Sequence, residues 1–165
     1  MAAAGRSWLA ESLASCFDSI YSDFVISENE QGTVILALQR AAHATLRALS
    51  VQLAELDLTA SEINALANMA DGSTRSIGEL ALDTATRPTT LTSLLDRLVR
   101  RGYVDRALDP GDRRSFRISL TDAGRPVARV ARAAMGDLER EALTAVTSTD
   151  LAGFRAVIRA LTEAP

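Results

Sequence analysis

Three helix-start signals follow one another in the middle of the chain, and they constrain the fold more than any other feature. Thr59 with Glu62, and Ser76 with Glu79, are spaced as capping boxes, in which each side chain binds the other residue's backbone N–H. Pro88 suits the first turn of a further helix, because its missing N–H would be unpaired there anyway. These signals predict three consecutive helices, over about residues 59–69, 76–82 and 88–101.

A strand pattern follows directly on these helices. Residues 103–108 are typical of one strand, and Phe116, Ile118 and Leu120 alternate with polar residues in a second. The intervening residues 109–112, Asp-Pro-Gly-Asp, favour a turn. Three helices before such a hairpin indicate a mainly α fold with a small β-hairpin wing, the winged helix-turn-helix. In that fold the last helix enters the major groove of DNA and the hairpin reaches the flanking backbone or minor groove.

The basic charge of the chain is concentrated in the same region. The whole chain has a net charge of −3, which argues against a nucleic-acid partner, since nucleic-acid-binding domains usually carry a basic surface. Residues 87–117, however, hold eight Arg and four Asp, a net +4, whereas residues 1–86 carry −7 and residues 118–165 are neutral. All 18 basic residues are Arg, which binds phosphate or guanine through two N–H groups at once. The sequence therefore predicts a basic DNA-binding element in an acidic frame.

Three stretches resemble the DNA-binding lobe of the MarR family of transcriptional regulators. They are residues 76–82 (SIGELAL), 89–104 (TTLTSLLDRLVRRGYV) and 109–121 (DPGDRRSFRISLT). The third stretch is the most specific, because Asp112 and Arg114, before a strand that ends in Leu120 and Thr121, match the family's Asp-x-Arg wing motif. The resemblance is specific over about residues 58–125.

The resemblance implies a contact surface for duplex DNA on the third helix and the wing. Arg114 would reach into the minor groove, where a narrow groove concentrates negative potential, and Asp112 would orient it. The short hydroxyl side chains of the helix would approach base edges and phosphates in the major groove. Alternatively, Asp112 and Arg114 only pair across the turn, and the Ser and Thr residues form a solvated helix face. The expected DNA-binding residues are Arg87, Thr89, Thr90, Thr92, Ser93, Arg97, Asp112, Arg113, Arg114 and Arg117.

Apolar stripes predict further helices on both sides of this lobe. Residues 7–26 and 33–56 carry apolar side chains at helical spacing, and residues 122–165 predict two closing helices. These helices have too little core of their own to cover their stripes. We therefore expect residues 1–56 and 122–165 to form dimerisation regions around a DNA-binding lobe at residues 57–121. A homodimer would place its recognition helices about 34 Å apart on a pseudo-palindromic operator.

The resemblance also implies a small-molecule effector, since members of the family commonly respond to aromatic or phenolic ligands bound between their lobes. His43 and Arg47 stand one helical turn apart and could hold an anionic group. Trp8 could line a pocket from the first helix. The alternatives are an exposed or interface pair for His43 and Arg47 and a core position for Trp8. Repression, with release by such a ligand, is the expected mode of regulation.

The remaining reactive residues argue against other functions. Cys16 is the one cysteine and His43 the one histidine, which excludes an internal disulfide and a zinc site of Cys and His ligands. Redox sensing through Cys16 stays an alternative, although Asp18 is close and thiolate formation needs cationic surroundings. The sequence contains neither a Gly-rich phosphate-binding loop nor an acid/base pair, the features that would indicate an enzyme. We expect a regulator without a cofactor, and a winged-helix module that binds protein instead of DNA is the other alternative.

The length of the apolar runs bears on the location of the protein. The longest run, residues 34–38, is far shorter than the roughly 20 residues that span a bilayer. The N-terminus has no basic segment followed by an apolar one, as a signal peptide would. The sequence therefore predicts a cytoplasmic protein with no membrane partner.

Overall fold

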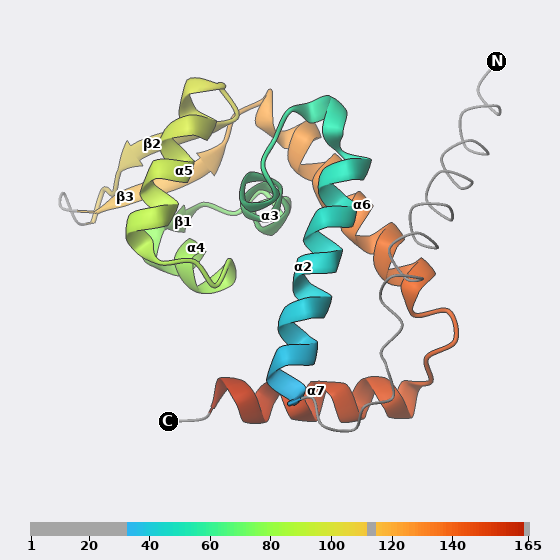
Figure 1. Ribbon diagram of the computed structural model, residues 1–165. Coiled ribbons are helices and arrows are strands. Elements are labelled where there is room, and N and C mark those ends of the chain that lie inside the picture. Colours follow the sequence, from blue (N-terminus) through green and yellow to red (C-terminus); the bar gives the residue numbers. More distant parts are fainter. Residues whose placement is uncertain (1–32, 112–114, 164–165) are drawn as a thin grey trace, which may run out of the picture. The chain divides into compact units, whose positions relative to one another are not determined.

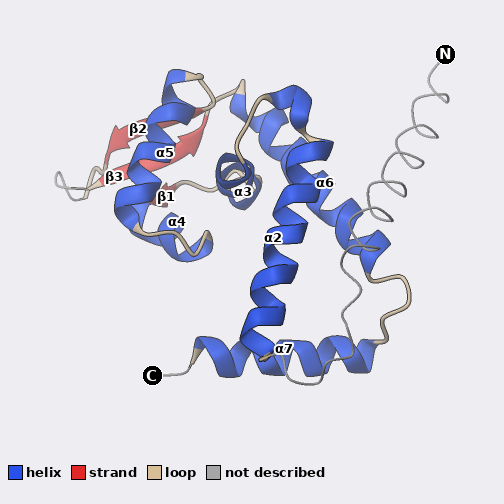
Figure 2. Ribbon diagram, viewed as in Figure 1, coloured by secondary structure: helices blue, strands red, loops and turns tan. Residues whose placement is uncertain are grey.

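The computed structural model describes residues 33–111 and 115–163 and is mostly helical, with one small sheet (Figures 1 and 2). The described residues divide into two compact units, with the boundary between Ala134 and Met135. Within the described residues no helix is both long and apolar enough to cross a membrane. The elements are α2 (Val34–Gln52), the 3-10 turn η1 (Ala54–Leu56), α3 (Ala60–Asn68), β1 (Arg75–Ser76), α4 (Ile77–Asp83), α5 (Pro88–Arg100), β2 (Val104–Leu108), β3 (Phe116–Leu120), α6 (Gly124–Ala142) and α7 (Ser148–Thr162).

The predicted helix starts are confirmed. The N–H of Glu62 donates to Thr59 Oγ1 (3.3 Å), and the N–H of Thr59 donates to Glu62 Oε2 (2.8 Å), so α3 begins with a capping box. Ser76 and Glu79 make the same reciprocal pair at α4. Pro88 is the first residue of α5. Local signals in the sequence therefore define where the three helices of the winged helix-turn-helix begin.

The single long helix expected over residues 33–56 is confirmed as far as Gln52 and is wrong only in its last turn. α2 ends at Gln52, one 3-10 turn follows, and Asp57 then adopts a left-handed backbone with φ 51°. A left-handed residue cannot continue a right-handed helix. Apolar periodicity did not reveal this break, because Leu53 and Leu58 on either side of it are both buried and continue the pattern.

The sheet has three strands, where the sequence predicted a two-stranded hairpin. β2 and β3 pair antiparallel, with Arg106 opposite Ile118. β1 pairs antiparallel with the other edge of β3, where Arg75 also lies opposite Ile118. A strand of two residues is too short to show an alternating pattern in the sequence. Its effect is to tie the start of α4 to the wing formed by β2 and β3.

The core of the first unit holds α5 in a fixed orientation. Leu91, Leu95 and Leu98 of α5 are completely buried and recur at helical spacing, so the opposite face of the helix lies at the surface. Apolar side chains from α2, α3, α4 and the sheet complete this core. The largest fully buried side chains are Leu49, Ile63, Leu66, Met69, Leu80, Leu91, Leu95, Leu98, Ile118 and Val104.

The second unit contains the end of α6 and the helix α7. Thr147 and Asp150 cap α7 with a third capping box, which the sequence analysis did not identify. None of the side chains of α7 is buried against the described residues, and Phe154 is 54% exposed, with Val157 and Leu161 exposed on the same helix. Side chains three to four residues apart share one face. α7 therefore carries an apolar stripe that its own unit leaves open.

Candidate nucleic-acid interface

One side of α5 presents hydroxyl and guanidinium groups to solvent. Thr89, Ser93 and Arg97 follow one another at four-residue spacing, so they share one face, and Thr90 is exposed beside them. Arg87, the residue before the first turn of α5, is exposed as well. These groups are hydrogen-bond donors and acceptors of the kinds that contact phosphates and base edges. The structure therefore brings the predicted helix residues together at the surface.

Thr92 differs from these residues, because it is half-buried and its hydroxyl is engaged. Its Oγ1 donates to the carbonyl oxygen of Pro88 at 2.9 Å. A hydroxyl has one proton and two acceptor lone pairs, so in this arrangement Thr92 can act toward DNA only as an acceptor. In the major groove, Thr92 could therefore accept a hydrogen bond only from the amino group of adenine or cytosine, which are the donors there. The sequence could not show this restriction, which depends on the side-chain rotamer.

Arg97 is bound to a buried carboxylate on α3. Its Nε donates to Glu62 Oε1 at 2.9 Å; the side chain of Glu62 is 4% exposed and that of Arg97 44%. Burial raises the pKa of Glu62, but hydrogen bonds from Arg97 and Thr59 outweigh it, so the pKa lies below its usual value and the carboxylate stays charged. The sequence does not reveal this pair, because its two members are far apart in the chain.

Arg101 anchors the end of α5 to the connection between α2 and α3. It donates to the carbonyl oxygen of Leu56 at 2.9 Å and to that of Asp57, and its guanidinium lies over the ring of Tyr103. Hydrogen bonds from a charged donor to backbone oxygens are stronger than neutral ones. Arg101 is therefore a structural residue, although it belongs to the basic segment.

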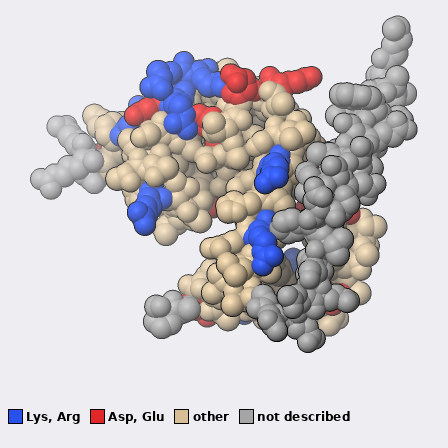
Figure 3. Space-filling view, in the orientation of Figure 1, with Lys and Arg blue, Asp and Glu red and all other residues tan. Residues whose placement is uncertain are grey.

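Arg100 is a candidate DNA contact that the sequence analysis did not include. It is exposed, and no hydrogen bond or ion pair engages it within the described residues. It lies seven residues after Ser93 and three after Arg97, so it continues the exposed face of α5. Figure 3 shows basic side chains gathered over this end of α5. The helical spacing in the sequence was sufficient to identify Arg100.

Replacing the two neighbouring arginines should separate DNA binding from stability. Arg100→Ala removes an unpaired cation, so the slope of log K against log salt should fall by about 0.9 for one lost phosphate contact, while the thermal midpoint stays unchanged. Arg101→Ala removes hydrogen bonds to two carbonyl oxygens and should lower the unfolding free energy by about 1–3 kcal/mol. Fluorescence anisotropy with labelled DNA and thermal melts measure the two effects. Equal thermal midpoints for the two variants would contradict these roles.

Asp109 organises the base of the wing. Its Oδ1 accepts from the N–H of Gly111 at 2.8 Å, and its Oδ2 accepts from Arg117 Nε at 2.6 Å. Arg117, a predicted DNA contact, is thus engaged inside the wing through Nε, and its side chain is 43% exposed. The wing tip, Asp112, Arg113 and Arg114, lies outside the described residues, so its contacts stay predictions.

A carboxylate on α5 joins the helix to the wing. Asp96 Oδ1 accepts from Arg106 Nη1 on β2 at 3.4 Å, and the Arg106 guanidinium lies 4.1 Å from the centroid of the Phe116 ring on β3. A cation over an aromatic face contributes about 0.5–1 kcal/mol at exposed sites. These side chains therefore hold the two parts of the predicted interface together.

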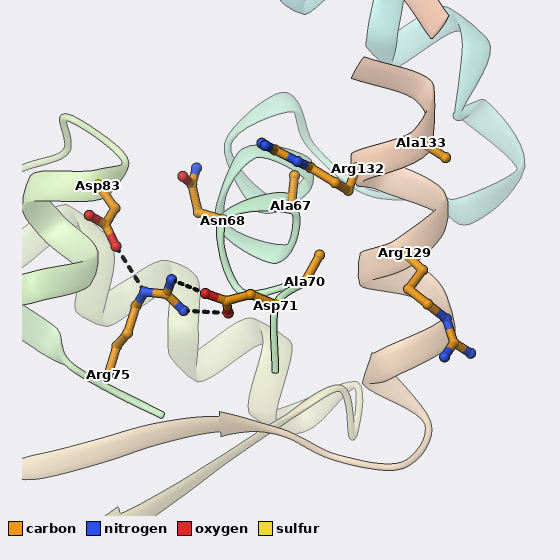
Figure 4. A pocket seen from close by; sticks show the side chains of 9 residues that line it. All are labelled: Ala67, Asn68, Ala70, Asp71, Arg75, Asp83, Arg129, Arg132 and Ala133. Atoms are coloured by element: carbon orange, nitrogen blue, oxygen red, sulfur yellow. Dashed lines mark hydrogen bonds and ion pairs between the residues drawn. The ribbon is translucent and has the colours of Figure 1, made fainter. Parts of the chain in front are cut away.

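A hollow of about 630 Å³ lies between α3, the turn before β1 and α6 (Figure 4). Arg75 is fixed there, with its Nη2 2.7 Å from Asp71 Oδ2 and its Nε 2.9 Å from Asp83 Oδ2. The hydrogen bond from Arg75 holds the pKa of Asp71 well below its usual range. Arg132 extends toward α3, whereas Arg129 points away from the hollow. Charges of both signs line this hollow, and it favours no one class of ligand.

The predicted effector residues are not brought together with this hollow. His43 and Arg47 are both exposed on α2, and neither lines it. Trp8 and Cys16 lie outside the described residues. Among the residues that the structure does describe, no cluster of His, Cys, Asp and Glu could hold a metal ion. The roles of all four residues stay predictions.

Comparisons with known proteins agree on one family. The family model described as "MarR family" matches residues 56–115. The multiple antibiotic resistance protein MarR of Escherichia coli is 28% identical over 114 residues, which cover 68% of this chain and 79% of MarR. A mutant of E. coli MarR complexed with operator DNA has a TM-score of 0.63 at 27% identity, covering 77% of this chain and 94% of that one. NadR in complex with 4-hydroxyphenylacetate, at 16% identity, has a TM-score of 0.70 and coverages of 84% and 99%, a likeness of fold alone.

Proposed function

Because the chain belongs to the MarR family of winged helix-turn-helix transcriptional regulators, we propose that it is a homodimeric repressor that binds a pseudo-palindromic operator. The family also confirms the predicted fold class and the prediction that the chain is not an enzyme. One observation carries the proposal. α5 buries leucines on one face and exposes hydroxyl and guanidinium groups on the other, which is the division that a recognition helix needs.

The surroundings of α5 support DNA as the partner. Residues 87–117 carry a formal net charge of +4. Arg87 and Arg100, whose side chains have no partner among the described residues, lie at opposite ends of the helix. Cations in such positions release counterions from DNA when they bind phosphate. A relative of this chain, a mutant of E. coli MarR, has been solved in complex with operator DNA. A protein-binding module would instead need exposed apolar groups on this face, and the exposed side chains named above are polar.

Open apolar surface supports the homodimer. The stripe of Phe154, Val157 and Leu161 on α7 is exposed, and so are Val34 and Ile35 at the start of α2. Each Å² of apolar surface removed from water contributes roughly 25 cal/mol. A two-fold dimer would cover the stripe of each copy with the same surface of the other. A mass in light scattering of one 17.6 kDa chain at micromolar concentration would refute the dimer.

We further propose that a small aromatic or phenolic ligand releases the repressor from DNA. The fold neighbour NadR is solved with 4-hydroxyphenylacetate, a phenol that carries a carboxylate. A ligand weakens DNA binding only if it favours the conformation that binds DNA poorly. A titration of the DNA complex with phenolic acids tests this step. Undiminished operator binding with every phenolic acid up to millimolar concentration would argue against it.

Arg114→Ala tests the proposed function most directly. We expect operator binding to weaken by about 1–3 kcal/mol, or roughly 5- to 150-fold, because a minor-groove guanidinium is lost. Anisotropy or gel shift with DNA from around the protein's own gene, at about 50–100 mM salt, measures the change. Arg129→Ala on α6 is the matched control and should bind like the wild type. Absence of specific binding by the wild type would refute the function, and unchanged affinity of Arg114→Ala would refute the role of the wing.

A further inference from the structure

We infer that Glu62 is a positioning residue for DNA recognition: its buried carboxylate holds Arg97 through Nε and so presents the Nη1 and Nη2 groups of Arg97 to DNA in one orientation. This inference rests on the proposed function of α5 as the recognition helix. It assigns a specificity role to a residue of α3, a helix outside the predicted contact surface.

The carboxylate of Glu62 is fixed by three donors. Its Oε2 accepts from the N–H and from the Oγ1 of Thr59, both at 2.8 Å, and its Oε1 accepts from Arg97 Nε at 2.9 Å. The side chain is almost completely buried. A buried carboxylate with both oxygens engaged from different directions has little freedom to rotate. Glu62 is thus a rigid support for the partner that it binds.

The guanidinium of Arg97 gains a defined orientation from this support. Arg is planar, with five N–H donors in a fixed fork, so a bond at Nε restricts where the Nη groups point. The guanidinium of Arg97 has no other hydrogen-bond partner in the described part of the chain, and the side chain is about half exposed. Two coplanar N–H donors are the groups that bind O6 and N7 of guanine or two phosphate oxygens. The geometry therefore prepares Arg97 for a directional contact.

Glu62 favours the directional contact of Arg97, but its negative charge should weaken binding to DNA of any sequence. Such binding depends on the number of cations that neutralise phosphates. A carboxylate paired to Arg97 cancels most of the charge that this arginine would offer to any DNA. Glu62 thus lowers the affinity for random DNA while it favours the fixed contact. A residue that only stabilised α3 would alter the two affinities in the same direction.

Glu62→Gln separates these two roles. The amide oxygen can still accept from the N–H of Thr59, but the negative charge is lost and Arg97 is released. Anisotropy with operator and with scrambled DNA of equal length should show tighter binding to scrambled DNA and a steeper salt dependence. Operator binding should weaken, so the ratio of the two affinities should fall by about 5- to 150-fold, the discrimination of one bidentate contact. Equal shifts for both DNAs, with the ratio kept, would overturn the inference.

Glu79→Gln is the matched control. Glu79 closes the same type of capping box on α4, but among the residues that the structure describes no arginine donates a hydrogen bond to it. This variant should keep the wild-type affinity ratio. In an Arg97→Ala background, Glu62→Gln should lower the ratio no further, because the residue that it positions is absent. A further drop in that background would overturn the inference.

A second variant decides the question if Glu62→Gln does not fold. Glu62→Asp keeps the charge but shortens the side chain by one methylene group, which withdraws the carboxylate from Arg97. It should lower the affinity ratio without tighter binding to scrambled DNA, and a wild-type ratio would refute the positioning role. A wild type that does not distinguish operator from scrambled DNA would refute the proposed function itself. A discriminating wild type with equally discriminating Glu62 variants would refute this inference alone.

Discussion

Gly124→Ala is expected to lower the unfolding free energy by about 3 kcal/mol or more, the upper range of overpacking effects. A Cβ at the first residue of α6 would overlap the carbonyl oxygen of Tyr103. That oxygen belongs to the backbone, so no side-chain rotation can make room. Two hydrogen bonds from Thr121 also hold this part of the backbone in place. The N–H of Thr121 donates to the carbonyl oxygen of Tyr103 at 3.1 Å, and its Oγ1 donates to the carbonyl oxygen of Gly102. The sheet and α6 would have to separate.

Thermal denaturation at fixed protein concentration measures this effect. For a chain of this length, 3 kcal/mol corresponds to a decrease in Tm of roughly 6–12 °C. Gly78→Ala in α4 is the matched control, since a Cβ there would meet only Ser76 Oγ at 4.0 Å. The control should keep or slightly raise the wild-type Tm, because alanine favours the helix. A wild-type Tm for Gly124→Ala would show that α6 does not begin against Tyr103.

Leu98→Ala is the second substitution with a large expected effect. Leu98 is 0% exposed and lies on the buried face of α5. Truncation of a buried leucine to alanine costs about 2–5 kcal/mol, because the transfer free energy is lost and a cavity remains. Since α5 is held by this core, operator binding should fall together with the Tm.

The residue next to Leu98 provides the control. Val99 is 39% exposed on the same helix, so Val99→Ala should cost less than about 1 kcal/mol. Denaturant unfolding with constant m-values gives the two free energies. Similar losses for the two variants would mean that α5 is not oriented as described.

The parts of the fold that sequence predicted well are those that local chemistry determines. The capping boxes of α3 and α4 involve residues three positions apart, and Pro88 acts within its own turn. The break at Asp57 was missed, because the burial of its neighbours continues the apolar pattern across it. β1 was missed since a two-residue strand depends on its partner β3 rather than on its own sequence.

The charge distribution of the candidate site, too, could be predicted from the sequence only in part. The sequence correctly located the basic segment, but formal charge does not reveal which arginines are already engaged. Arg97, Arg101, Arg106 and Arg117 all bind acceptors within the protein. These partners lie on other elements or across the wing, so helical spacing in the sequence does not reveal them. Only the folded chain distinguishes a cation such as Arg100, which has no partner within residues 33–111 and 115–163, from one that holds the structure together.

The division of α5 into a leucine face and a hydroxyl face determines how this protein can acquire new target sequences. Substitutions at Thr89, Thr90 and Ser93 face solvent and should each change stability by less than about 0.5 kcal/mol. Operator preference can therefore diverge at these positions, by natural variation or by design, without compensating changes in the core. Arg97 is the exception, because its carboxylate partner lies on another helix. A library that randomises position 97 has to vary position 62 with it.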